Sequence, residues 1–155
     1  MKTSVIGYPR VGALRELKFA TEKYFKKALS KEELQAVASG LKEGYWKIQN
    51  EVDFISSNDF SFYDNLLDTA VLLNAVPKRY KKLGLDALDE YFAMARGYQG
   101  DKGDVKALAM KKWFNTNYHY MVPEIEDETE ILLSGTKPFD EYLEAKKLGI
   151  ETKPA

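Results

Sequence analysis

The chain contains no cysteine and a single histidine, His119, among its 155 residues. Without cysteine there can be no disulfide, no thiolate zinc ligand and no cysteine nucleophile. One histidine is too few for a histidine-based metal centre. We therefore expect no complete transition-metal site within these residues.

Long apolar runs and an excess of one charge are also missing. No segment approaches the roughly 18 apolar residues that a membrane span requires, and no apolar stretch follows residues 1–4 as in a secretion signal. We therefore expect a cytoplasmic protein without membrane contact. The 23 Lys and Arg residues nearly balance the 24 Asp and Glu residues, so no overall field favours nucleic acid.

Short apolar segments alternate with amphipathic ones along the chain. Strand candidates lie at 5–8, at 52–55 and within 110–122. Ser30 and Glu33 have the spacing of a capping box, which predicts the start of a helix. Together with that helix, which extends to Ile48, the helical patterns cover 14–29, 63–73, 86–96 and 138–149.

This alternation predicts a parallel α/β sheet with crossover helices. Three strands, with the approach to a fourth after Gly149, amount to about half of a (β/α)8 barrel, which needs on the order of 250 residues. We expect residues 1–155 to form a single incomplete α/β domain. Open sheet edges would then favour self-association.

Three connections bear on function. Asn58, Asp59 and Ser61 follow a predicted strand, where α/β folds build ligand sites, so their position predicts exposed candidate ligands, although local turn bonds of Asp and Asn are the commoner explanation of this spacing. The glycine-rich segment 97–104 predicts a flexible surface loop and matches no phosphate-binding motif. The acidic run 124–130 is typical of a solvated connection.

Two segments are candidate binding surfaces. Arg15 and Lys18 are three residues apart at a predicted helix start, where cations and free amides favour an anion. Basic residues dominate this stretch: Arg10, Arg15, Lys18, Lys23, Lys26 and Lys27 against Glu16 and Glu22. An ordinary solvated helix face is the alternative.

The second segment follows Lys112 and is dense in aromatic residues, namely Trp113, Phe114, Tyr118 and Tyr120. One interpretation is a strand that leads into a functional loop, where aromatic rings support a ligand. The other is packing of these rings in the core.

Several segments, in order over the whole chain, resemble cobalamin-independent methionine synthase. They are GYPRVG at 7–12, RELK at 15–18, NDFSFYD at 58–64, YFAMARG at 91–97, KWFNTNYHYMVPE at 112–124 and the closing Lys153-Pro154. The resemblance implies the first half of the N-terminal barrel of a two-barrel enzyme. Such enzymes transfer a methyl group from 5-methyltetrahydropteroyltri-L-glutamate to L-homocysteine to form methionine.

The resemblance also implies where the chemistry lies. In this family a zinc ion, held by His, Cys and Glu of the C-terminal barrel, activates the homocysteine thiol. That barrel is absent here, so we expect the chain alone to be inactive and to meet homocysteine only through the missing part. What carries over is folate binding, by Arg15, Glu16, Leu17, Lys18 and Lys112.

The chain departs from the family at two positions, which commonly hold Gly and His where Asn58 and Asn65 stand. Two other hypotheses stay open. One is a stand-alone, non-catalytic module that binds folate, another anion or a protein. The other is an unrelated α/β protein with a sugar or phosphate ligand.

Overall fold

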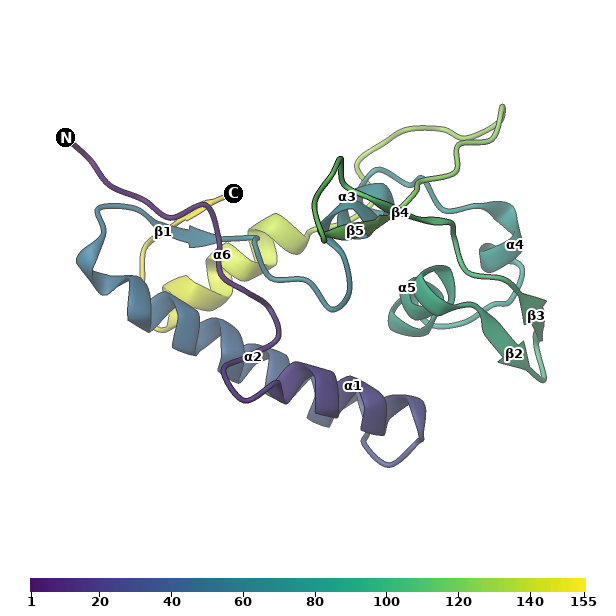
Figure 1. The fold of residues 1–155 in the computed structure, drawn as a ribbon, viewed down its shortest axis with the longest axis horizontal. Helices are drawn as coiled ribbons and strands as arrows, with labels where there is room; N and C mark the ends of the chain where they lie inside the picture. Colours follow the sequence, from purple (N-terminus) through teal and green to yellow (C-terminus); the bar gives the residue numbers. More distant parts are fainter. The chain divides into compact units, whose positions relative to one another are not determined.

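The computed structural model describes residues 1–155 and divides them into two units (Figure 1). We call Met1–Phe62 with Lys137–Ala155 the terminal unit, and Tyr63–Thr136 the central unit. Both contain helices and short strands, so the α/β class is confirmed. The strands form three two-stranded sheets and no barrel.

The terminal unit is built on a short parallel pair of strands. β1 (Ile55–Ser57) pairs with β6 (Thr152–Pro154), and an isolated parallel bridge joins Ser4 to Phe54. The helices are α1 (Glu16–Phe25), α2 (Lys31–Ile48) and α6 (Lys137–Lys147), with a 3-10 turn at Gln49–Glu51. α6 packs against both strands, α2 against β1, and α1 against α2.

Helix α2 begins where its sequence predicts. The Ser30 hydroxyl accepts a hydrogen bond from the Glu33 amide, and the Glu33 carboxylate accepts one from the Ser30 amide, which completes the capping box. Leu34, Ala38 and Trp46 are buried along one face of α2, and Leu17 and Ala20 are buried on α1. These side chains belong to the buried core of the unit, in which α1 packs against α2.

The central unit contains three helices and two antiparallel hairpins. Its helices are α3 (Asn65–Leu72), α4 (Lys78–Lys81) and α5 (Ala87–Arg96). The first hairpin joins β2 (Tyr98–Gly100) to β3 (Gly103–Val105), and the second joins β4 (Met110–Lys112) to β5 (His119–Met121). Asp86 caps α5, whose backbone ends at Gly97 with a φ of 81°.

Several predictions about strands are wrong. Residues 5–8 form no strand, and the second strand begins at Ile55 rather than Val52. Segment 97–104 is a hairpin rather than a flexible loop, and the strand predicted within 110–122 pairs antiparallel. The closing residues form β6, because they find a partner in β1. An apolar pattern does not predict which segment a strand will pair with.

The acidic run 124–130 is partly tied to α4. Glu124 forms a bidentate ion pair with Arg79, and Glu128 bonds Lys78 at 3.0 Å. The hydrogen bonds from Arg79 lower the pKa of Glu124 below its ordinary 4.5. Ionised Glu124 therefore stabilises the folded state above that pH, and this stabilisation is lost as the pH falls through the lowered pKa.

We expect Glu124→Gln to lower the free energy of unfolding by at most about 1 kcal/mol at pH 7, because the pair is partly exposed. At pH 3 the difference from the unsubstituted chain should shrink. Urea unfolding at both pH values measures this, with Glu130→Gln in the same run as the control. An equal loss at both pH values would contradict the assignment.

Candidate functional site

The segment before α1 is held in an irregular conformation by contacts inside the terminal unit. The Tyr8 amide donates to Asp59 Oδ2 at 2.8 Å, and Arg10 Nη1 donates to the Phe62 carbonyl at 2.9 Å. The Tyr8 ring stacks on Tyr45 with 5.0 Å between centroids. Burial of Tyr45 raises the pKa of its hydroxyl. Arg10 is thus tied to the backbone here.

Arg15 stands just outside α1, as its N-cap, with a left-handed φ of 64°. Its amide donates to the Gly12 carbonyl at 3.1 Å, and Gly12 itself has a φ of 88°. The Glu16 carboxylate turns back and accepts from the Leu14 amide at 3.0 Å. This turn leaves the Arg15 side chain exposed at the start of the helix.

The four residues 15–18 therefore have different environments. Leu17 is fully buried, and its amide donates to the Val11 carbonyl. Lys18 is exposed, lies 3.6 Å from Glu22, and has its ammonium 5.8 Å from the centre of the Phe19 ring. Arg15 and Lys18 are thus the two cationic side chains available to an anion, while Leu17 anchors the helix.

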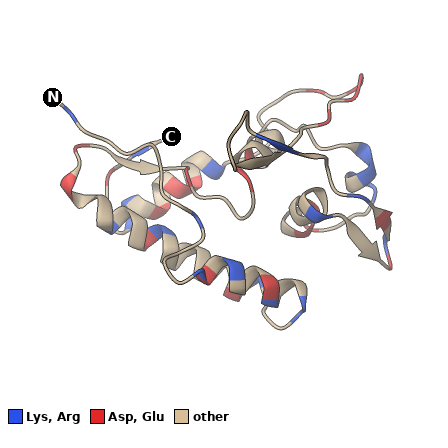
Figure 2. Cartoon of the chain, in the orientation of Figure 1, with Lys and Arg blue, Asp and Glu red and all other residues tan.

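The wider basic stretch is less uniform than its sequence suggests. Lys23, Lys26 and Lys27 are exposed, and Lys27 has a left-handed φ of 57° after the helix end. Figure 2 shows acidic and basic segments following one another along α1 and α2. A local anion site at the start of α1 fits this distribution better than a continuous basic surface.

Loop 58–61 makes structural bonds instead of offering free ligands. Asn58 donates from its side chain to the Ala155 carbonyl at 2.9 Å, accepts from Lys137, and donates its amide to Glu141. Ser61 is 1% exposed, so its predicted exposure is wrong. The φ of Asn58 is 64°, in the left-handed region that Gly and Asn adopt most easily. Asn can therefore stand at this position, where the sequence departs from the commonly expected Gly.

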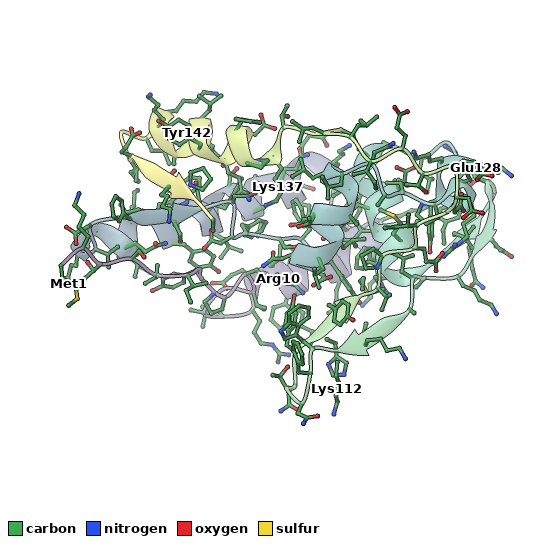
Figure 3. The ribbon with its side chains drawn as sticks, turned by 90° about the horizontal axis from the view of Figure 1, so that it is seen from above. Met1, Arg10, Lys112, Glu128, Lys137 and Tyr142 are labelled. Carbon is green, nitrogen blue, oxygen red and sulfur yellow. The ribbon has the colours of Figure 1, made fainter.

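Lys112 is the last residue of β4, in the central unit, and its side chain is exposed (Figure 3). Trp113, Phe114 and Tyr118 follow it and are 43%, 81% and 47% exposed, so packing in the core does not explain them. The Trp113 ring meets Phe114 and Tyr120 edge to face, at 5.2 and 5.4 Å. A cation thus stands beside an exposed group of rings.

Asp64 was not among the predicted site residues, yet it is 3% exposed and bonds to the β4–β5 hairpin. Its position before a helical stripe could have marked it as an N-cap. Its bonds to Tyr118 and Met121 join segments that are far apart in the sequence, so no local sequence pattern predicts them.

Possible metal ligands do not cluster in this structure. No group of three or more His, Cys, Asp or Glu side chains could hold a metal ion. His119 is exposed, with its Nδ1 2.9 Å from the Asn117 carbonyl. No helix is long and apolar enough to cross a membrane.

The fold and the exposed cations define a mixed α/β protein that presents Arg15 and Lys18 on one unit and Lys112 on the other. The family described as cobalamin-independent synthase, N-terminal domain, matches residues 2–155. The chain therefore belongs to this family, and the resemblance seen in the sequence is confirmed.

Relatives with assigned names agree with this family. The 5-methyltetrahydropteroyltriglutamate--homocysteine methyltransferase of Campylobacter jejuni subsp. doylei is 68% identical to this chain, and that of Streptococcus pneumoniae serotype 19F is 57% identical. Each match covers 99% of this chain but 21% of the relative. The chain thus spans about a fifth of their length.

Proposed function

We propose that the chain acts as the N-terminal part of a methyltransferase that moves a methyl group from 5-methyltetrahydropteroyltri-L-glutamate to L-homocysteine. Its own contribution is to bind the polyglutamate tail of the folate. The supporting observation is that Arg15 and Lys18 are exposed at the start of α1, within a chain that matches the family over residues 2–155.

The tail carries several carboxylates, so more than one cation can bind it. Arg15 can bind a carboxylate with two hydrogen bonds, whereas Lys18 and Lys112 act as point charges. Glu16 and Leu17 act indirectly, because the Glu16 carboxylate accepts from the Leu14 amide and the Leu17 side chain is fully buried. These five residues are our proposed folate-binding residues.

The methyl transfer itself needs groups that this chain lacks. A zinc ion with His, Cys and Glu ligands would lower the pKa of the homocysteine thiol. With no cysteine and no group of three possible ligands, these residues do not fit zinc. We therefore assign homocysteine and zinc to the remaining four-fifths of the enzyme, and propose that the 155-residue chain alone is inactive.

The barrel is likewise part of the proposal. Ser4, β1 and β6 are aligned parallel, which is the pairing that a (β/α)8 barrel uses. We propose that residues 1–155 contribute a single incomplete α/β domain to the N-terminal barrel of a two-barrel enzyme. The open edges of these strands would favour self-association of the isolated chain.

We expect the chain to bind the triglutamyl folate more tightly than the monoglutamyl form, with a preference that weakens as salt rises. Arg15→Ala and Lys18→Ala should each weaken triglutamate binding roughly fivefold and leave monoglutamate binding unchanged. Calorimetric titration of the 155-residue chain measures this, with its mass checked by sedimentation because of its open edges.

Lys47→Ala is the matched control for Lys18→Ala. Lys47 is also exposed on a helix and also paired with a glutamate four residues away, Glu43. The Lys47→Ala variant should bind both folates with the affinities of the unsubstituted chain. Equal affinity for the two folates, or an equal loss in the Lys47 variant, would contradict tail binding at the start of α1.

A further inference from the structure

The β4–β5 hairpin that carries Lys112 has little to stabilise it from within. Its two strands are three residues each, and isolated hairpins of this kind are marginal in water. Phe114 in its loop has a left-handed φ of 50°, a strained conformation for an aromatic residue. The direction in which Lys112 points must therefore be set by contacts with the rest of the central unit.

The carboxylate of Asp64 supplies such contacts to the hairpin. Its Oδ1 accepts from the Tyr118 hydroxyl at 2.5 Å, and its Oδ2 accepts from the Met121 amide at 3.0 Å. The same Oδ2 accepts from the Leu67 amide at 3.1 Å, which caps α3. One buried carboxylate thus joins Tyr118, just before β5, and Met121, at its end, to the start of a helix.

The backbone of Asp64 is itself held in place. The Tyr91 hydroxyl, which comes from α5, accepts from the amides of Tyr63 and Asp64 at 3.2 Å each. Tyr91 and Asp64 are 8% and 3% exposed, so water competes little for these bonds. The position of the carboxylate is therefore set by two helices.

The connection to Lys112 runs through the backbone of Tyr118. The Trp113 amide, directly after Lys112, donates to the Tyr118 carbonyl at 2.8 Å. Lys112 is also paired in register with His119, next to Tyr118. Losing the bond between Tyr118 and Asp64 would remove one restraint on the residue against which Lys112 and Trp113 are aligned.

We propose that Asp64 and Tyr118 are positioning residues that orient the Lys112 hairpin for the polyglutamate tail. They act through the hairpin without touching the ligand, and this inference rests on the proposed role of Lys112 in tail binding. The tail preference then depends on the hydroxyl of Tyr118 as well as on the charge of Lys112.

The test is a double-mutant cycle of Tyr118→Phe and Lys112→Ala in the 155-residue chain. Tyr118→Phe should weaken triglutamate binding roughly fivefold and leave monoglutamate binding unchanged. In the Lys112→Ala background it should cause no further loss. Amide hydrogen exchange at Trp113 should become faster in Tyr118→Phe.

Tyr98→Phe is the control, because it removes a hydroxyl bonded to Asp101 in the β2–β3 hairpin. It should change neither affinity. Losses that add up in the double variant, or that affect both folates equally, would overturn the positioning role. If Lys112→Ala itself leaves triglutamate binding intact, the proposed role of Lys112 fails. Unchanged exchange at Trp113 in Tyr118→Phe refutes only the positioning role of Asp64 and Tyr118.

Discussion

Asp64→Ala should lower the free energy of unfolding by about 3 kcal/mol. The substitution deprives three donors of their acceptor at once, the amides of Leu67 and Met121 and the hydroxyl of Tyr118. Asp64 is 3% exposed, so water replaces the carboxylate poorly. Urea unfolding followed by circular dichroism measures the loss, and hydrogen exchange should rise in both α3 and β5.

Asp86→Ala is the matched comparison, because Asp86 also caps a helix in the central unit. Its carboxylate accepts from the amides of Leu88 and Asp89, both in α5, and its side chain is exposed, unlike that of Asp64. We expect a loss of about 1 kcal/mol, as for an ordinary cap. Equal losses in the two variants would mean that Asp64 is a helix cap and nothing more.

Gly12→Ala should lower the free energy of unfolding by about 2 kcal/mol and weaken triglutamate binding. Gly12 has a φ of 88°, which strains any residue with a Cβ. An added Cβ would lie 2.0 Å from Glu16 Oε2 and 2.9 Å from Leu41 Cδ2. Either the turn that exposes Arg15 or the contact between α1 and α2 must then shift.

Gly40→Ala is the control for this change, with the opposite sign. Gly40 lies within α2, and an added Cβ would meet nothing within 4 Å. Alanine there should raise the free energy of unfolding by roughly 0.5 to 1 kcal/mol and leave folate binding unchanged. A Gly12 variant as stable as the unsubstituted chain would show that the turn before α1 adapts freely.

Local patterns predicted helices well in this chain. The capping box predicted at Ser30 formed, and the helical pattern at 86–96 became α5 with Asp86 as its cap. In both caps the side chain and the amide that it bonds are within three residues. Pro138 lies in the first turn of α6, where its missing amide proton costs nothing. Such bonds depend on the local sequence and need no partner from a distant segment.

The candidate site was predicted in part. Exposure of Arg15, Lys18 and Lys112 agrees with the expectation, but their ligand stays a prediction. The sequence does not reveal that Arg15 is left-handed, that Leu17 is fully buried, or that the rings after Lys112 are exposed. Spacing shows which residues share a helix face, but it does not identify what covers that face.

By itself, the sequence determined the α-helices other than α4, the lack of cysteine, and the family. Only the tertiary structure decided that the closing residues pair with β1 and that Asp64 holds a hairpin 54 to 57 residues away in the chain. The physical reason is how far apart in the sequence the bonded groups are. A helix satisfies its amides within a few residues, whereas a strand or a buried carboxylate depends on partners that folding brings from afar.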